Sequence, residues 1–313
     1  MPINSIYLHW KNLRGDDMIY KIMSFFLTLF LSLGIIPPLS EVTPVNPADD
    51  PVTSVSEEFT IMTYNVKVSG VGKYKPETRS EYVIDTVMKN YPDSVGFQEV
   101  SEDWYSWLKE GLDGYDFRGE ARNSDGTGEA SPVFFRADKY ECVDYDTFWL
   151  SETPDTPSKG WDAMYNRVCT YVILEEKSIG FTYAHFNAHF DHIGSQARNE
   201  SVSLITSVIA RVCPDIPVLF TGDLNDEEGS IMYGRILDSG LKDIKYEASD
   251  SADMGTFHGY SKITEASRKK PIDFVFANAY CKSASSYEVL TEKYNGIYSS
   301  DHHPVKTVIT LSN

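Results

Sequence analysis

The sequence predicts an α/β fold: a four-layered α/β/β/α sandwich in which two mixed β-sheets pack face to face with helices outside. Short apolar, β-rich segments recur from residue 59 to the end, with amphipathic helical segments between them. These segments fall into two sequence halves, a pattern that favours two packed sheets. The chain has 313 residues, 42% of them hydrophobic and 13% aromatic, which is sufficient for one large core.

Each element is predicted from a local pattern. The strand segments alternate or are wholly apolar, as in Phe59–Val66, and the helical segments repeat apolar residues every three to four positions. Ser101 is a candidate N-cap, and the Gly- and Asp-rich residues 119–130 predict a loop. The predicted strands are 59–66, 93–100, 133–136, 140–150, 168–174, 180–189, 217–222, 272–277, 287–290 and 305–311. The predicted helices are 78–90, 101–110, 200–212 and 231–237.

The N-terminal 58 residues have the composition of an export signal followed by a linker. Residues 22–40 carry no charge, basic residues precede them, and Pro37-Pro38 interrupts the apolar run. This is typical of a secretory signal peptide over residues 1–40, with Met18 as an alternative start. An uncleaved anchor is the other interpretation, although the strongly apolar stretch is shorter than the ~20 residues of a membrane span.

Residues 41–58 are rich in Pro, Ser, Thr and acid, which predicts a flexible linker. The catalytic domain is then expected to begin at Phe59 and to include the rest of the chain. We expect an exported protein, periplasmic or secreted, with no stable membrane insertion after signal removal, and a monomer.

The net charge limits the possible partners. Lys and Arg number 28 against 46 Asp and Glu, a formal charge of −18. A field of this sign repels phosphodiesters and excludes binding of nucleic acid through a broad basic surface. It does not exclude a phosphoesterase, because metal ions in an acidic pocket invert the local charge.

The four cysteines are Cys142, Cys169, Cys213 and Cys281. They are far apart in sequence and form no CxxC pair, so a thiol-ligated zinc site is not expected. Three disulfide pairings are possible and the sequence does not choose among them. Isolated buried thiols are the simpler interpretation.

Polar residues capable of binding a metal recur at the ends of the predicted apolar strands. They are Asn65, Gln98, Glu99, His189, Asp223, Asn225, Asp273, Asp301 and His302. Each alone has a structural explanation: Asn65 in a turn, Glu99 in a first helical turn, His189 in the core. Together they matter more, because a buried isolated carboxylate costs several kcal/mol unless it is paired or bound to metal. The set predicts a hard cation with oxygen ligands, Mg²⁺ or Mn²⁺.

These segments resemble the endonuclease/exonuclease/phosphatase superfamily in identity and order. The matching motifs are Met62-Thr-Tyr-Asn65, Gln98-Glu99, Asn187-Ala-His-Phe-Asp191, Gly222-Asp-Leu-Asn225, Ile272-Asp-Phe-Val-Phe276 and Ser300-Asp-His-His-Pro304. Gly-Asp-Leu-Asn together with Ser-Asp-His is the most specific part. The resemblance implies a metal-dependent phosphoesterase and covers essentially the whole predicted domain.

The resemblance also implies roles for the metal ligands and the groups around the attacked phosphorus. Asn65 and Glu99 would hold the metal with help from Asp301. Asp223 would position or deprotonate the attacking water, and no covalent enzyme intermediate is needed.

Four further catalytic roles follow from the same motifs. Asn225 would hold a non-bridging phosphate oxygen, and His189 would donate to the phosphoryl group. His302, oriented by Asp273, would act as a base or as an electrostatic stabiliser.

Candidate substrate contacts are Arg167, Arg198, Phe257 and His258. Arg167 could bind phosphate bidentately, with Arg198 a similar candidate. Phe257 could stack on a ring or belong to the core, and His258 lies beside it in the substrate-contacting segment Thr256-Phe-His-Gly259.

Loops rather than the fold decide the substrate. The relevant loops are 73–78, 119–130, 151–166 and 255–270, and the last contains Lys262, Arg268, Lys269 and Lys270. We expect hydrolysis of phosphodiester bonds by in-line attack of water, with nuclease activity as one version. The alternatives are a phosphomonoesterase or phospholipase acting on sugar phosphates, inositol phosphates or a sphingomyelin-like lipid, and a non-catalytic binding module.

Overall fold

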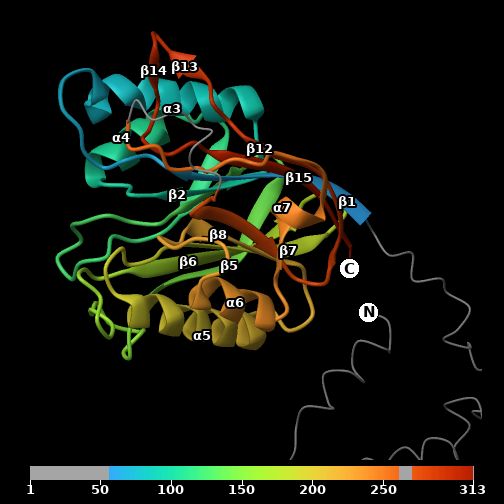
Figure 1. The fold of residues 1–313 in the computed structure, drawn as a ribbon. Coiled ribbons are helices and arrows are strands. Elements are labelled where there is room, and N and C mark those ends of the chain that lie inside the picture. Colours follow the sequence, from blue (N-terminus) through green and yellow to red (C-terminus); the bar gives the residue numbers. More distant parts are fainter. Residues whose placement is uncertain (1–55, 261–269, 313) are drawn as a thin grey trace, which may run out of the picture. The chain divides into compact units, whose positions relative to one another are not determined.

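The computed structural model describes residues 56–260 and 270–312, and Ser54–Asn313 is one compact unit. Two large sheets carry most of the strands (Figure 1). The first has the order β10-β12-β15-β1-β2-β4-β3 and the second the order β5-β6-β7-β8-β11-β9. Both contain parallel and antiparallel pairs, for example β1 with β2 parallel and β1 with β15 antiparallel. The predicted pair of mixed sheets is therefore confirmed.

The strands of the first sheet are β1 (Ser56–Asn65), β2 (Ser94–Gln98), β3 (Tyr115–Arg118), β4 (Val133–Arg136), β10 (Ala248–Ser251), β12 (Cys281–Val289) and β15 (Val305–Ser312). Those of the second are β5 (Tyr140–Trp149), β6 (Val168–Glu176), β7 (Thr182–His189), β8 (Val218–Asp223), β9 (Lys242–Asp243) and β11 (Asp273–Ala277). The helices are η2 (Gly72–Tyr74), α3 (Pro76–Asn90), α4 (Glu102–Gly111), α5 (Ser195–Val212), α6 (Ile231–Asp238) and α7 (Ile244–Glu247). A separate hairpin joins β13 (Lys293–Tyr294) and β14 (Ile297–Tyr298).

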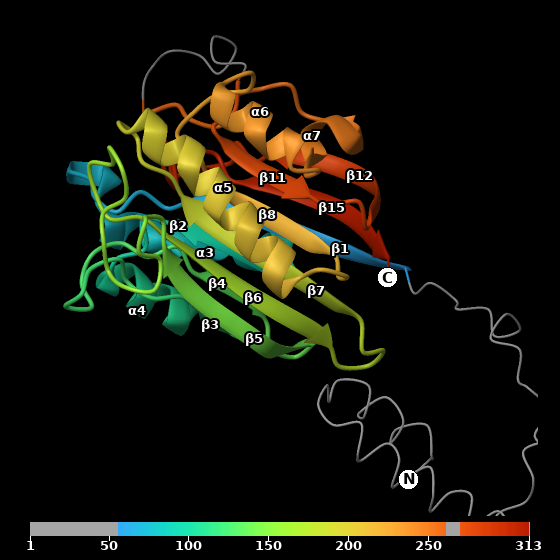
Figure 2. The ribbon, with the colours of Figure 1, turned by 90° about the horizontal axis from the view of Figure 1, so that it is seen from below.

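Four layers follow from where the apolar side chains lie. Helices α3 and α4 cover one sheet through residues such as Val87 and Trp104, which pack on Phe97. Helices α5 and α6 cover the other sheet, where Ile205 packs in one cluster with Phe220. Between the sheets a third cluster contains side chains from both inner faces. Figures 1 and 2 show the helices on the two outer faces and the sheets between them.

The first strand begins earlier than predicted, at Ser56 rather than Phe59. Its polar start pairs with the end of the chain, in the register Ser56↔Ser312. Main-chain pairing holds these residues in the sheet although their side chains give no strand pattern. Residues 56–58, which the sequence assigned to the linker of 41–58, therefore belong to β1.

Helix α5 begins at Ser195, five residues before the predicted start. Its N-cap residue, Gly194, makes no side-chain cap. The carboxylate of Asp162 supplies the cap instead, accepting hydrogen bonds from the main-chain nitrogens of Gln196 (3.2 Å) and Ala197 (2.7 Å). Because the capping residue lies more than thirty positions away, the local sequence does not indicate where the helix begins.

Several short elements were not predicted from the sequence: η2, β3, β9, α7, β10, β13 and β14. Most are brief and polar, and some pair with a strand far along the chain, as β10 does with β12. Strand β12 itself begins at Cys281 rather than at residue 287, because its polar, exposed first half pairs with β15. All four cysteines are free thiols, as expected, with Cys142 partly exposed.

The predicted signal peptide of residues 1–40, most of the predicted linker and the basic residues Lys262, Arg268 and Lys269 lie outside the described residues. Within residues 56–260 and 270–312, no helix has the length and apolar character needed to span a membrane.

Candidate active site

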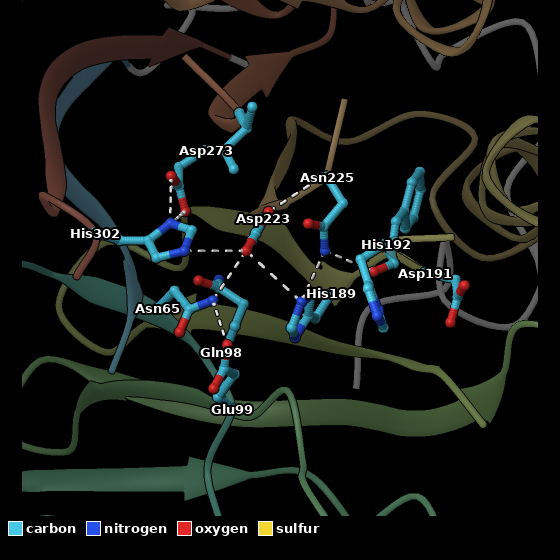
Figure 3. A network of polar contacts seen from close by, with 12 residues as sticks. Asn65, Gln98, Glu99, His189, Asp191, His192, Asp223, Asn225, Asp273 and His302 are labelled. Carbon is cyan, nitrogen blue, oxygen red and sulfur yellow. Dashed lines mark hydrogen bonds and ion pairs between the residues drawn. The ribbon is translucent and has the colours of Figure 1, made fainter. Parts of the chain in front are cut away.

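The two-residue repeat of the strands directs the predicted site residues between the sheets. On β1, Met62 and Tyr64 pack toward the helices, so Asn65 points inward. On β8, Phe220 packs outward, so Asp223 points inward. Because β1 and β2 are parallel, as are β7 and β8, the strand ends lie at one edge of the sandwich. Figure 3 shows the resulting cluster.

A buried polar network joins the inner faces below this cluster. Gln98 donates from Nε2 to Asn187 Oδ1 (2.7 Å), which also accepts from Thr221 Oγ1 (3.1 Å). His185 bridges the sheets through Ser94 Oγ and Thr221 Oγ1, both at 2.8 Å. The sheets approach closely here: a Cβ on Gly96 would lie 2.4 Å from Thr221 Oγ1. The network fixes the register of one sheet on the other beneath the site.

Three residues just past the strand ends have left-handed main-chain conformations, uncommon for residues other than glycine. They are Lys67 (φ 61°), Glu99 (φ 61°) and Asn225 (φ 50°). Each follows a strand by one or two residues. Such conformations concentrate at functional sites, and here they turn the chain sharply around the cluster.

Asp223, His302 and Asp273 form the centre of the cluster. His302 Nδ1 lies 2.9 Å from Asp273 Oδ2 and 3.2 Å from Oδ1, and its Nε2 lies 3.7 Å from Asp223 Oδ2. Burial alone would lower the pKa of His302, but the carboxylates of Asp273 and Asp223 raise it above its usual value. Burial, with Asp273 nearby, raises the pKa of Asp223. The imidazole is therefore held as a cation between two carboxylates.

Asn65 and Glu99 lie next to Asp223. Asn65 donates from Nδ2 to Asp223 Oδ2 (2.9 Å) and to Glu99 Oε1 (3.1 Å). Glu99 Oε2 accepts from the main-chain nitrogen of Val68 (2.7 Å). Burial opposes ionisation of Glu99, but this hydrogen bond and the charge of Lys67 lower its pKa overall. Glu99 is thus an ionised carboxylate beside Asp223.

Asp301 completes this side of the site. Its Oδ2 lies 3.6 Å from Lys67 Nζ, and its Oδ1 is buried without a hydrogen-bond partner among the described residues. A buried carboxylate oxygen of this kind normally has a partner. Hard oxygen donors with an unsatisfied atom fit a divalent cation such as Mg²⁺.

A second group could also bind a metal. Asp223, Asp273 and His302 present ligand atoms within 4.8 Å of one another. Both oxygens of Asp273 are occupied by His302, however. The unsatisfied oxygen of Asp301 makes the Glu99 side of the cluster the better fit for an ion.

His189 is held between Asn225 and Asp223. Asn225 Nδ2 donates to the carbonyl of Phe190 (3.0 Å) and lies 3.0 Å from His189 Nε2. Because an amide nitrogen only donates, His189 Nε2 accepts and the ring proton lies on Nδ1. Burial and nearby cations, with Arg167 first, lower the pKa of His189 well below its usual value. His189 Nε2 also lies 3.6 Å from Asp223 Oδ2, so in this arrangement a neutral imidazole faces both Asn225 and Asp223.

Two residues of the loop 119–130 reach the site without having been identified from the sequence. Arg122 pairs with Glu129 through two contacts of 3.0 and 3.2 Å, and Glu129 Oε2 lies 4.0 Å from His189 Nδ1. The main chain of Arg122 is fixed by Trp149 Nε1, which donates to its carbonyl (2.7 Å). The sequence indicated only that residues 119–130 form a Gly-rich loop. Which charged side chains of the loop turn toward the site depends on its tertiary contacts.

Arg167 lies beside this pair. It is buried, with Nε 3.4 Å from Asp191 Oδ2 and Nη2 3.2 Å from His192 Nδ1. Arg122, Glu129, Arg167 and His189 line a cavity of about 10 Å³, the size of one water molecule. Two guanidinium groups therefore lie next to the catalytic cluster, Arg122 paired with Glu129 and Arg167 with Asp191.

The other predicted substrate contacts lie around the edge of the cluster. Arg198 binds the loops after β7 and β8, through the carbonyl of Asp191 (2.9 Å) and Asp226 Oδ2 (3.2 Å), so its guanidinium already binds protein groups. Phe257 packs on the imidazole of His302 with ring centres 4.8 Å apart. His258 donates from its main-chain nitrogen to the carbonyl of Asp301 (3.0 Å) and packs on Tyr298 and His303.

Comparison with known proteins agrees with this geometry. Residues 62–302 match the model of the Endonuclease/Exonuclease/phosphatase family. A Bacteroides thetaiotaomicron protein of that family is 31% identical, with a TM-score of 0.78 over 82% of this chain and 99% of its own. A mannosyl-6-phosphatase from the same species is also 31% identical, with a TM-score of 0.76 over 80% and 99%. An uncharacterized mimivirus protein is 25% identical over 74% of this chain and 91% of its own.

Proposed function

The chain belongs to the endonuclease/exonuclease/phosphatase family and is a hydrolase of phosphate ester bonds, and from that premise we propose that it is an exported, Mg²⁺- or Mn²⁺-dependent enzyme. The observation that carries the mechanism is the Asp223–His302–Asp273 cluster at the buried end of the sandwich. It places a carboxylate with a raised pKa against a fixed cation. Such a pair suits proton removal from water and stabilisation of the charge that develops on phosphate.

Asp223 is the group that orients the attacking water and removes its proton. Its raised pKa brings it closer to working pH, where a base is most effective. Asn65 holds the Asp223 carboxylate from the Glu99 side. Water therefore attacks directly, and no covalent enzyme intermediate forms.

His302 acts as an electrostatic stabiliser rather than as a base, because the two carboxylates keep its imidazole protonated. Asp273 orients the ring through Nδ1 and leaves Nε2 facing Asp223. Of the two roles that the resemblance implies for His302, base and electrostatic stabiliser, we therefore propose the second.

Glu99 and Asp301 would hold the divalent cation, with Asn65 orienting Glu99. When bound, such an ion neutralises charge on the phosphoryl group and on the leaving oxygen. Asn225 Nδ2 contacts His189 Nε2 and so holds the imidazole in position. For His189 to donate to a phosphoryl oxygen, the contact between Asn225 and Nε2 must first open.

For the substrate, we favour a small phosphomonoester, such as a sugar phosphate, over the phosphodiester expected from the sequence. A monoester carries more negative charge at the phosphate than a diester, and the guanidinium groups of Arg122 and Arg167 lie beside His189 of the catalytic cluster. The net charge of −18 disfavours long polyanions. A relative that covers most of this chain is a mannosyl-6-phosphatase.

The test is a substrate panel at fixed enzyme concentration: hexose 6-phosphates, inositol phosphates, bis-(4-nitrophenyl) phosphate, single-stranded DNA and sphingomyelin, each with Mg²⁺, Mn²⁺ or EDTA. Asp223→Asn serves as the control for contaminating phosphatase. We expect Mg²⁺- or Mn²⁺-dependent release of phosphate from a sugar phosphate, and no turnover in EDTA. Faster cleavage of the diester or of DNA would overturn the substrate proposal, and full turnover in EDTA would overturn the metal proposal.

A further inference from the structure

A fixed positive charge lies beside the carboxylates that would hold the divalent cation. Lys67 Nζ is 3.6 Å from Asp301 Oδ2, and the charge of Lys67 also acts on Glu99. The main-chain nitrogen of Lys67 donates to Asn65 Oδ1 (2.9 Å). The lysine thus contacts Asp301 and Asn65 and acts electrostatically on Glu99, so it reaches both carboxylates that would hold the metal and the amide that orients one of them.

The main chain of Lys67 is anchored, so this charge is a built feature of the site. Its carbonyl accepts from Arg79 Nη2 (2.6 Å) and Trp104 Nε1 (3.3 Å). Arg79 is fully buried and also binds the carbonyls of Val66 and Ser299. With φ at +61°, the residue is held in a conformation that points its side chain at Asp301.

We propose that the Lys67 ammonium is the internal counter-ion of this site: it neutralises the Glu99 and Asp301 carboxylates in the metal-free protein and competes with the divalent cation for them. The inference rests on the metal dependence in the proposed function. Two carboxylates next to one ammonium carry a net charge of −1, so this side of the cluster holds one divalent ion and holds it more weakly than the carboxylates alone would.

The Lys67 side chain keeps about a third of its surface exposed. The Lys67 ammonium can therefore move toward solvent when a cation binds, which reduces the repulsion between the ammonium and the cation without removing it. An ordinary surface lysine would have no effect on metal affinity. The two interpretations therefore differ in whether removing the charge lowers the dissociation constant of the metal.

The experiment is isothermal titration of Mn²⁺ into the full chain and three variants. Lys67→Met removes the charge and keeps an unbranched side chain, and Lys67→Arg keeps the charge. Lys73→Met is the matched control, because Lys73 is exposed on η2 in the same segment. We expect one Mn²⁺ per chain, a dissociation constant at least ~10-fold lower in Lys67→Met, and values near wild type in the other two.

Thermal unfolding gives a second readout. In EDTA, Lys67→Met should melt below wild type, because Glu99 and Asp301 lose their counter-ion, and saturating Mn²⁺ should raise its melting temperature more than that of wild type. A lysine with only a structural role would lower the melting temperature equally with and without Mn²⁺. Unchanged or weaker Mn²⁺ binding by Lys67→Met overturns the inference. Failure of wild type to hydrolyse any phosphate ester is a separate result. It would overturn the proposed function, but the Mn²⁺ dissociation constants of wild type and the variants could still be compared.

Discussion

Removing the charge on His302 should disable catalysis through Asp223. The two groups lie 3.7 Å apart, His302 Nε2 to Asp223 Oδ2, and both are buried. At an effective dielectric constant near 20, unit charges at that distance interact by about 4 kcal/mol. Loss of the cation would therefore raise the pKa of Asp223 further and leave less of the carboxylate ionised at neutral pH. We expect His302→Ala and Asp223→Asn each to lower turnover at least ~100-fold, equivalent to about 2.7 kcal/mol in activation free energy.

The two variants should differ in their pH dependence. In wild type, turnover should fall as the pH drops through the raised pKa of Asp223, above the usual range of an aspartate. In His302→Ala this limb should move to higher pH, so the defect shrinks as the solution becomes more alkaline. In Asp223→Asn the titrating carboxylate at this position is gone, so the residual turnover should lack this limb and the defect relative to wild type should shrink as the pH drops. Asp273→Asn should resemble a milder His302→Ala, because the imidazole stays but loses its orienting charge.

The assay is steady-state hydrolysis of the best substrate from the panel, at saturating Mg²⁺, across a pH series. Circular dichroism confirms folding, which should survive because these side chains lie at strand ends. Wild-type turnover in a folded His302→Ala variant would refute the mechanism. A pH-independent defect in that variant would instead refute the proposed coupling between His302 and Asp223.

Three further predictions follow from other parts of the molecule. Glu99→Gln should weaken Mn²⁺ binding, so that added Mg²⁺ partly restores turnover; a defect of the same size at every Mg²⁺ concentration would argue against a metal ligand. Arg79→Met should lower the free energy of unfolding in urea by about 3–5 kcal/mol, because the carbonyls of Val66, Lys67 and Ser299 lose their charged donor. The control is Arg235→Met, since Arg235 is exposed. A loss below about 1 kcal/mol for Arg79→Met would contradict the view that Arg79 anchors these carbonyls. N-terminal sequencing of the exported protein should show that roughly the first 30–40 residues are absent; an N-terminus at Met1 or Met18 would refute cleavage.

Much of the fold and most of the cluster were predictable from the sequence. Strands such as β4 and β8 can be predicted from their apolar runs, and the two-residue repeat of a strand fixes which side chains share a face. Asn65, Glu99 and Asp223 each stand at or just beyond the end of such a strand, and His302 lies just before β15. Parallel pairing of β1 with β2 and of β7 with β8, and antiparallel pairing of β1 with β15, bring these positions to one edge. Local pattern alone therefore predicts that polar groups gather at one edge of a two-sheet sandwich.

Protonation states and the groups that complete the site required the tertiary structure. The sequence shows His189 and His302 as similar residues at strand ends. The structure makes one a neutral acceptor facing Asn225 and the other a cation between two carboxylates. Burial and the charges of other strands and loops, Asp273 and Asp223 for His302 and Arg167 for His189, make the largest contributions to these pKa values.

The same reason explains the residues that sequence analysis missed. Lys67 and Glu129 are ordinary charged residues in their local sequence, and Asp162 is an ordinary loop acid. Their roles come from contacts with Asp301, His189 and the first turn of α5. The sequence by itself determined which faces and ends carry the chemistry, because that depends on a two-residue repeat. Only the tertiary structure decided which distant charges meet there, because electrostatic interactions act through space over a few ångströms and do not depend on separation along the chain.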